Sequence, residues 1–423
     1  MARFIIGGER RLGGKFIPGG TKNAALPMLA ACTLTDEPVI LDNLPLIDDV
    51  KTMLSILDGL GVEVTLDDHS VTLRARNLKD GRLPQDLCRQ VRSSILFAGP
   101  LVARLGKAVI YPPGGDVIGR RRLDTHFAGL QALGIDVDCN SHYTFKRRRL
   151  RGAAIVLDEA SVTGTENILM AAVLAAGRST IYNAACEPHV QDLCTLLNKM
   201  GARIGGIGTN LLTIDGVKRL HGARHRILPD LIETGSFLAA AAITGGALTI
   251  PDIEPSHTAI IHNTFARLGI TWNVNRAGLR LAPHRPLRVA HDFGTPVPKI
   301  EDGPWPAFPS DLMSIMIVAA TQAIGTTLLF EKMFESRLYF VDQLISMGAN
   351  ITLCDPHRVV VVGPARLHGT SMAGPDIRAG MALPLAALTA RGESIIGNAQ
   401  CIDRGYEKIE CKLQALGASI ERA

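Results

Sequence analysis

Residues 190–214 read VQDLCTLLNKMGARIGGIGTNLLTI, and this stretch contains the element that organises the whole chain. An amphipathic helix, with Leu193 and Leu197 on one stripe, ends at Met200-Gly201 and leads into a strand pair joined by a Gly/Asn turn. The same Leu-Gly or Met-Gly ending before a short strand recurs at intervals of 67 to 79 residues. The six glycines are Gly61, Gly134, Gly201, Gly269, Gly348 and Gly417. The pattern predicts one supersecondary unit copied six times.

Each unit also contains a helix that is apolar nearly all round, such as 168–176 (ILMAAVLAA) or 237–243. A helix without a polar face must be buried on every side. Short strands are expected after these helices, at 39–41, 108–111, 179–182, 247–250, 326–330 and 394–396. We therefore expect an α/β fold with buried helices at the centre and sheets outside.

Six units are too many for one core, so two lobes of three units are expected. The residues around 229–230 are the expected crossing point. The segments 4–6 and 16–17 read as strands before the first full unit, and the strand 419–421 lacks a partner. The two ends of the chain are therefore expected to pair. An open solenoid is the alternative, which the lack of polar end caps disfavours.

This division assigns residues 1–21 and 230–423 to one lobe. The other lobe is expected to span 22–229 and to carry an irregular loop at 111–124.

The composition is that of an ordinary soluble protein. The chain has 423 residues, 47% of them hydrophobic, and a formal net charge of +5, which suits an enzyme with anionic substrates better than a protein that coats nucleic acid. No apolar stretch is long enough for a signal peptide or a membrane span, so a cytoplasmic protein with free thiols is expected. The sequence contains no phosphate-binding glycine motif and no His/Cys metal spacing, so neither a cofactor nor a metal is predicted. The oligomeric state stays open.

Several charged residues lie at the ends of apolar elements, where nothing structural requires them. Lys22 and Asn23 begin the first buried helix. They would either bind an anion at the N-terminus of that helix, or Lys22 would be a solvated lysine in a turn. The loop YPPGGDVIGRRRLD would act as a lid that delivers Asp116 and one or more of Arg120, Arg121 and Arg122, or would be an exposed hairpin. Asp311 precedes another buried helix, where it would also be an ordinary cap.

Further arginines occupy comparable places, and Asp376 and Asp403 are alternative partners for two of them. These arginines are Arg92, Arg378 and Arg404. Together the cations predict a divided site that closes around an anion-rich ligand. The basic run 146–149 is interpreted as a solvated hairpin tip, because no aromatic residues or DNA-binding pattern accompany it.

The chain resembles the enolpyruvyl transferase family. The matching segments span the chain in order: GGTKNAALP, VRSSILFAGPLVAR, PPGGDVIGRRRLDTH, SVTGTENILMAA, LPDLIETGSFLAAAA, PAFPSDLM, MFESRLYFV, DIRAG and IDRGYEKIE. The resemblance implies a two-lobed inside-out α/β barrel. It implies transfer of enolpyruvyl from phosphoenolpyruvate to the 3-hydroxyl of UDP-N-acetylglucosamine, through a tetrahedral intermediate and with release of phosphate, at the start of peptidoglycan synthesis. The signature of relatives that act on shikimate phosphate is not found.

The resemblance also implies roles for individual residues. Lys22, Arg92, Arg121 and Arg404 would hold phosphoenolpyruvate or nearby anions, and Asp311 would accept the proton of the attacking hydroxyl. Contacts to the UDP-sugar are expected from Asn23, Arg121, Arg122, Leu123, Asp124, Thr125, Ser161, Val162 and Met333. Support of a closed state is expected from Arg337, Asp376 and Arg378.

The chain departs from the family pattern at three positions. Asp116 replaces the usual lid cysteine; a carboxyl can still donate a proton, so catalysis is expected together with resistance to the thiol-alkylating antibiotic fosfomycin. Leu231 stands where an arginine is frequent, and Glu159 where some members have lysine. Both changes remove positive charge near the UDP-sugar. They leave two alternatives open: a paralogue acting on another nucleotide, and a catalytically silent regulatory paralogue.

Overall fold

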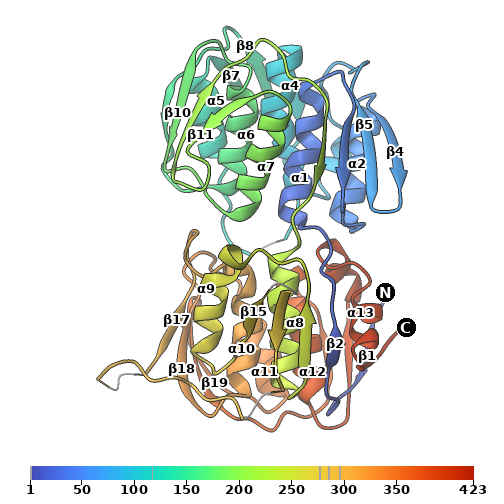
Figure 1. Cartoon of the computed structure of the whole chain (residues 1–423), viewed down its shortest axis with the longest axis vertical. Coiled ribbons are helices and arrows are strands. Elements are labelled where there is room, and N and C mark those ends of the chain that lie inside the picture. Colours follow the sequence, from blue (N-terminus) through green and yellow to red (C-terminus); the bar gives the residue numbers. More distant parts are fainter. Residues whose placement is uncertain (1, 117, 276–277, 284–285, 295–296) are drawn as a thin grey trace. The chain divides into compact units, whose positions relative to one another are not determined.

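The computed structural model describes residues 2–116, 118–275, 278–283, 286–294 and 297–423. Its contacts divide the chain into two compact units (Figure 1). Unit 1 contains residues 2–19, 118–120 and the described residues from 229 to 423. Unit 2 contains residues 20–116 and 121–228.

The helix endings of the repeat adopt the conformation that glycine makes accessible. Gly61, Gly134, Gly201, Gly269, Gly348 and Gly417 have φ values between 81° and 100°. After Gly201, the N–H of Ala202 reaches back to the carbonyl oxygen of Leu197 at 3.0 Å, and the same bond follows Gly61, Gly269, Gly348 and Gly417. This is the Schellman arrangement, which closes the helix end and turns the chain into the next strand.

Unit 2 packs its apolar helices against one another at its centre. These inner helices are α1 (Lys22–Ala31), α4 (Ala98–Leu105) and α6 (Val162–Ala172), with η1 (Cys32–Leu34) and η2 (Arg92–Phe97) beside them. The helices nearer the surface are α2 (Asp48–Gly59), α3 (Gln85–Cys88), α5 (Asp124–Ala132) and α7 (Pro188–Lys199). Nearly every described residue of α1 and α6 is buried, because neither helix has a polar face.

Three sheets of unit 2, counted in its described residues, have related strand orders. One is β13 (Ala223–Arg226), β3 (Val39–Asp42), β5 (Ser70–Arg74) and β4 (Glu63–Asp67). The second is β9 (Ala154–Val156), β10 (Arg178–Tyr182), β12 (Leu211–Asp215) and β11 (Arg203–Gly205). The third is β6 (Lys107–Ile110), β8 (Tyr143–Arg147) and β7 (Ile135–Cys139). In the first two sheets a parallel pair is followed by two antiparallel pairs.

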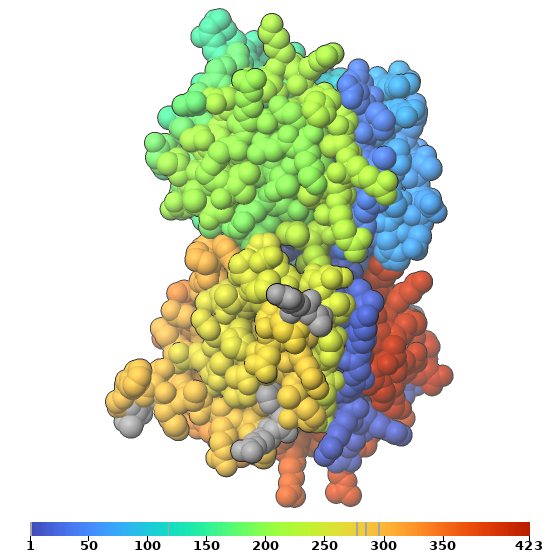
Figure 2. Space-filling view, viewed as in Figure 1, coloured from blue at the N-terminus to red at the C-terminus, as the bar shows by residue number. Residues whose placement is uncertain are grey.

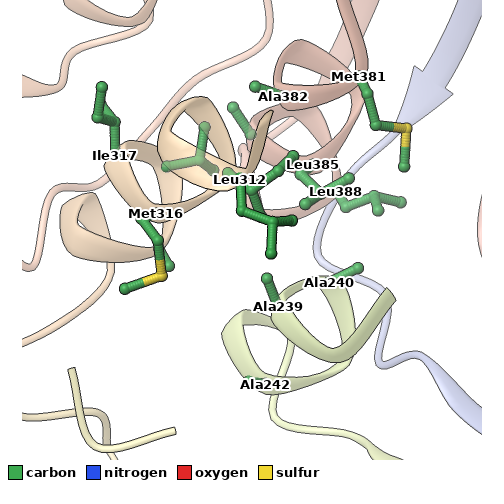
Figure 3. Packing of buried hydrophobic residues seen from close by; sticks show 14 of the residues in the cluster. Ala239, Ala240, Ala242, Leu312, Met316, Ile317, Met381, Ala382, Leu385 and Leu388 are labelled. Atoms are coloured by element: carbon green, nitrogen blue, oxygen red, sulfur yellow. The ribbon is translucent and has the colours of Figure 1, made fainter. Parts of the chain in front are cut away.

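Unit 1 repeats this plan. Its inner helices are α8 (Leu231–Ile243), α10 (Met313–Thr321) and α12 (Ile377–Thr389). The others are α9 (Pro255–Ala266), α11 (Val341–Ser346), α13 (Ile409–Ala415), η3 (Ser310–Leu312) and η4 (Ala399–Arg404). Figure 3 shows side chains of α8, α10 and α12 gathered around Leu312.

The sheets of unit 1 keep the same strand order. They are β2 (Gly13–Lys15), β14 (Ala247–Ile250), β16 (Gly278–Leu281) and β15 (Asn273–Asn275); β17 (Lys299–Glu301), β18 (Gly325–Phe330), β20 (Arg358–Gly363) and β19 (Asn350–Asp355); and β21 (Ser371–Ala373), β22 (Glu393–Gly397), β1 (Phe4–Gly7) and β23 (Ser419–Arg422). The chain ends pair as expected, because β1 runs antiparallel to β23. Figure 2 shows the N-terminal segment beside the C-terminal one on the surface of this unit. The predicted α/β fold with central buried helices is confirmed, although the sheets of the described residues stay separate and form no single closed barrel.

Two local predictions are wrong. The strand expected at 16–17 lies at Gly13–Lys15. The N–H of Phe16 still donates to the carbonyl oxygen of Thr249 on β14 at 2.9 Å, and its ring stacks on Phe237 with centroids 3.9 Å apart. The basic run 146–149 is not a hairpin tip: the β7–β8 turn lies at 140–142, and Lys146 and Arg147 end strand β8.

The close approach of α4 and α6 generates a stability prediction. A Cβ added to Gly99 would lie 2.1 Å from the carbonyl oxygen of Asn167, whereas one added to Gly397 would meet nothing closer than 3.6 Å. We expect Gly99→Ala to lower the free energy of unfolding by roughly 2 kcal/mol or more through overpacking. Gly397→Ala is the matched control and should change it by less than about 1 kcal/mol. Urea unfolding measures both; equal stability of the two variants would contradict the packing described.

Candidate active site

Lys22 and Asn23 begin helix α1 in unit 2. Lys22 is buried, and its Nζ lies 2.6 Å from a carboxylate oxygen of Asp49 on α2. The alternative of a solvated lysine in a turn is therefore wrong. Asn23 follows it with a partly exposed side chain. Helix α1 packs against η2, which begins at Arg92, so the two cationic residues start neighbouring elements.

Arg92 is a partly buried cation that lies near a second one, Arg121. Its Nη2 donates to the backbone oxygens of Arg121 at 2.7 Å and Arg122 at 3.2 Å. Burial, with a smaller effect from the charge of Arg121, lowers the pKa of Arg92 to about 10. An anion bound between these guanidinium groups would relieve the repulsion between them.

The sequence-predicted segment 121–125 meets the residues that precede α6. Arg122 pairs with Asp124 and with Asp158, each at 3.0 Å. The hydroxyl of Thr125 donates to Asp158 at 2.9 Å and to Glu159 at 3.3 Å. Glu159 therefore occupies a hydrogen-bonded place beside the predicted sugar-contacting residues.

Ser161, Val162 and Leu123 complete this group in unit 2. Ser161 caps α6 by accepting the N–H of Gly164 at 3.2 Å, and Val162 is the first residue of that helix. The side chain of Leu123 is buried. The structure thus brings together the predicted residues 92, 121–125 and 161–162.

A buried histidine that sequence reasoning missed supports this group. His126 Nδ1 lies 3.0 Å from Nδ2 of Asn167, which also donates to the carbonyl oxygen of Ile95. Nδ1 is therefore an acceptor, so Nε2 carries the proton and donates to Thr163 at 3.1 Å. Burial lowers the pKa of His126 to about 3, with a smaller effect from Arg92, so the ring is neutral in the physiological range. Its place directly after Thr125 was the only sequence signal for it.

Asp311 lies between two arginines in unit 1. Its Oδ1 is 2.8 Å from Nη2 of Arg337, and its Oδ2 is 2.8 Å from Nη2 of Arg378. Both guanidinium groups are buried, while the carboxylate is 26% exposed. Burial by itself would raise the pKa of Asp311, but the charges and hydrogen bonds of Arg378 and Arg337 lower it well below its ordinary value. Asp311 is therefore an ionised carboxylate that is partly open to a ligand.

The two acidic residues of the last repeat take part in a helix cap and an ion pair. Asp376 caps α12 by accepting the N–H groups of Arg378 at 2.7 Å and Ala379 at 3.0 Å, while the side chain of Arg378 turns to Asp311. Asp403 pairs with Arg422 at 2.6 Å. Arg404 ends η4.

The two remaining predicted residues are partly accessible. Met333 is 41% exposed on the segment that follows β18. Asp116 lies in a stretch without helix or strand and is partly exposed. Residue 117 of the loop 111–124 lies outside the described residues. Ile118 belongs to unit 1, where its carbonyl oxygen accepts the N–H of Ser336 at 3.2 Å.

In the described ranges of the chain no group of three or more His, Cys, Asp or Glu side chains is placed to hold a metal ion. Among the helices of those ranges, none is long and apolar enough to cross a bilayer.

Comparison with known proteins places this geometry in context. Residues 7–413 match the profile of a family described as EPSP synthase (3-phosphoshikimate 1-carboxyvinyltransferase). A curated relative from Treponema denticola is 52% identical over 422 residues, covering 100% of this chain and 99% of its own length. Relatives from Borreliella burgdorferi (50%; 100% and 99% covered) and Bradyrhizobium diazoefficiens (50%; 99% and 98% covered) are similar. All three are named UDP-N-acetylglucosamine 1-carboxyvinyltransferase.

Solved structures show the same fold at lower identity. The enolpyruvyl transferase NikO from Streptomyces tendae matches with a TM-score of 0.88 and 23% identity, covering 100% of this chain and 99% of that one. EPSP synthase from Acinetobacter baumannii matches with a TM-score of 0.79 and 18% identity, covering both chains in full.

The Asp311 group generates a prediction about pH. In Asp311→Asn the buried guanidinium groups of Arg337 and Arg378 lose their counter-charge, so we expect a loss of roughly 3 kcal/mol of unfolding free energy at pH 7. Because folding lowers the pKa of this carboxyl, its stabilisation is present above the ordinary aspartate pKa and declines as the pH falls below it. The difference from wild type in urea unfolding should therefore shrink below about pH 4. The exposed Asp342→Asn is the control; a difference that stays constant down to pH 2 would contradict the assignment.

Proposed function

The chain belongs to the EPSP synthase family of enolpyruvyl transferases, and we propose that it transfers enolpyruvyl from phosphoenolpyruvate to the 3-hydroxyl of UDP-N-acetylglucosamine, releasing phosphate. The observation that carries the choice of acceptor is an identity of about half, over the whole chain, with relatives named for that reaction. The reaction opens peptidoglycan synthesis, and with it cell-wall growth, cell shape and division. We place it in the cytoplasm, where both substrates are made.

The cations of unit 2 suit the phosphoenolpyruvate end of the reaction. Phosphoenolpyruvate carries a phosphate and a carboxylate. Lys22 is buried beside Asp49, and the positive charge of Arg121 acts on the partly buried Arg92. Preorganised donors of this kind stabilise an anion without reorganisation during the reaction. Arg404 of unit 1 is proposed to act on the same substrate.

The Asp311 group suits the acceptor hydroxyl. A carboxylate takes the hydroxyl proton as the oxygen attacks C2 of phosphoenolpyruvate. Arg337 and Arg378 make Asp311 a weak base while they hold both of its oxygens. Anionic substrate groups would draw these arginines away, and the basicity of Asp311 would rise when the substrates are bound. Asp376, by capping α12, supports the backbone that carries Arg378.

Asp116 is proposed as the acid that protonates the methylene carbon of phosphoenolpyruvate. Protonation at C3 makes C2 electrophilic, and attack by the 3-hydroxyl gives a tetrahedral intermediate. Loss of a C3 proton and expulsion of phosphate then yield the product enol ether.

The UDP-sugar is proposed to lie along residues 121–125, Ser161 and Val162, with Asn23 and Met333 also in contact. Glu159 receives a hydrogen bond from Thr125, and Leu231 begins α8 as a partly buried apolar residue. Both positions lack the positive charge that other members carry. Another nucleotide as acceptor therefore remains the second candidate, and a silent paralogue the third.

An acceptor assay separates these candidates. The protein is mixed with phosphoenolpyruvate and one acceptor, and phosphate release is measured. We expect release with UDP-N-acetylglucosamine and none with UMP or shikimate 3-phosphate, because the relatives near 50% identity carry the first name. Release with UMP alone would favour the recruited paralogue, and no release with any acceptor would favour the silent one.

The lid position generates a chemical prediction. Wild type should resist fosfomycin, because a carboxylate is a far poorer nucleophile than a thiolate. Asp116→Cys should be alkylated in a time-dependent manner while retaining transfer, and its descending pH–rate limb should move relative to wild type. Asp116→Asn is the control and should lose most activity. Rapid covalent inactivation of the wild type, abolished in Asp116→Asn, would overturn the proposal.

A further inference from the structure

Two buried carboxyl groups lie near Asp311, and the reaction described above uses neither. Asp302 directly follows β17 and Glu331 directly follows β18, and these strands are parallel neighbours in one sheet. Their exposed fractions are 1% and 0%. Buried carboxylates are unfavourable unless they are paired or protonated, so the two groups need an explanation.

Both carboxyl groups accept hydrogen bonds from one turn. Asp302 Oδ1 accepts the N–H of Lys332 at 2.5 Å. Glu331 Oε1 accepts the N–H groups of Met333 and Phe334, each at 3.2 Å. The pair therefore fixes the backbone of a turn that contains a predicted sugar-contacting residue, Met333.

The same pair is connected to Asp311 through a single residue. The hydroxyl of Ser310 lies 2.8 Å from Oε1 and 2.9 Å from Oε2 of Glu331. The carbonyl oxygen of Ser310 accepts from Nη1 of Arg337 at 3.4 Å, and Nη2 of Arg337 binds Asp311. Movement of the turn would therefore move Arg337 relative to the base.

The oxygen atoms of the pair lack one donor. Asp302 Oδ2 is buried and has no hydrogen-bond partner among the described residues. Glu331 Oε1 is occupied by two backbone N–H groups, whereas Oε2 shares only the Ser310 hydroxyl. A proton on Oε2 would supply the missing donor to Asp302. Burial raises the pKa of Glu331 to about 9. The hydrogen bond that a protonated Glu331 would donate to Asp302, and the charge of Asp302, raise it too, whereas Arg337 and Ser310 lower it.

The other charged groups around Asp302 and Glu331 form ion pairs with one another or contact the backbone. Glu301 pairs with Lys299 at 2.6 Å and with Lys332 at 3.4 Å. From the β19–β20 turn, His357 Nδ1 contacts the backbone oxygen of Glu331 at 2.7 Å rather than its carboxyl group. In the same turn Asp355 and Arg358 pair at 2.5 Å. Arg337 is thus the cation whose charge bears on Glu331, and Asp311 and Arg378 already form a group with it.

We propose that Glu331 and Asp302 share one proton, and that this protonated pair is a positioning device that holds the 332–337 segment so that Arg337 meets Asp311. Loss of the proton would place two carboxylates side by side, and their repulsion would loosen the turn. The link to catalysis rests on the proposed function, whereas the shared proton does not.

A stability measurement tests the shared proton without any assay of activity. The folded protein keeps the proton up to about pH 9, whereas an unfolded glutamate loses it near 4.5. Between these values the wild type therefore loses stability as the pH rises. Glu331→Gln, which cannot ionise, should not lose it, so its Tm relative to wild type should increase from pH 5 to pH 9 and then level off. The exposed Glu393→Gln is the matched control and should differ from wild type by a constant amount.

A second measurement tests the positioning role. The kcat/KM of wild type for UDP-N-acetylglucosamine should fall near pH 9, and Glu331→Gln should lack this limb while retaining activity within about threefold at pH 7. Asp302→Asn should also lack it, because the amide can donate to Glu331 and no second carboxylate remains to repel it. Glu331→Ala should lose activity at every pH. If the fall of kcat/KM at high pH came from Asp116 instead, wild type and Glu331→Gln would both show it.

The outcomes separate the two claims. A Tm difference between Glu331→Gln and wild type that is flat from pH 5 to 9 would overturn the shared proton. The expected Tm behaviour with an unchanged alkaline limb would overturn the positioning role. If wild type transfers enolpyruvyl to no acceptor, the proposed function fails, and the Tm comparison still decides the shared proton.

Discussion

The architecture depends on the burial of helices that have no polar face. In α10 every residue from Met313 to Thr321 is buried, and in α8 and α12 nearly all are. Such a helix is stable in water only if other elements cover its whole circumference. Each unit meets this requirement by packing its apolar helices together and placing sheets and half-exposed helices around them. Each repeat thus supplies the sheet and the half-exposed helix that cover one apolar helix.

The sequence predicted the elements well because their signals are local. A glycine after an amphipathic helix needs only its own left-handed conformation, and Gly61 to Gly417 all adopt it. The ends of the predicted short strands lie within a residue or two of the observed ones for the same reason. The errors occurred where a contact with a residue far away in the sequence determines the local structure. The ring of Phe16 stacks on Phe237, more than 200 residues away, and no local pattern reveals this contact.

In the candidate site, too, the residues could be predicted from local sequence signals and their contacts could not. Motif segments identified Lys22, Arg92, Arg378 and Asp311, whose types stand out at element ends. Their partners were not predictable: Asp49 lies on another helix, and the sequence offered Asp376 rather than Asp311 as the partner of Arg378. Glu331 and Asp302 carry no motif at all. Their importance follows from burial and from the missing donor at Oδ2, which are properties of three-dimensional packing.

The place of β1 has a consequence for biosynthesis. This strand, residues 4–7, lies between β22 and β23, both of which belong to the last 31 residues of the chain. Residues 4–7 are therefore synthesised long before the strands with which they pair, and their sheet cannot form until those strands exist. Both parts of unit 2, residues 20–116 and 121–228, are synthesised long before β22 and β23. Domains generally fold as units during synthesis, so unit 2 can be native on the ribosome while the N-terminal strand is still an unpaired edge. Synthesis of β23 is thus the step after which the sheet around β1 can be completed.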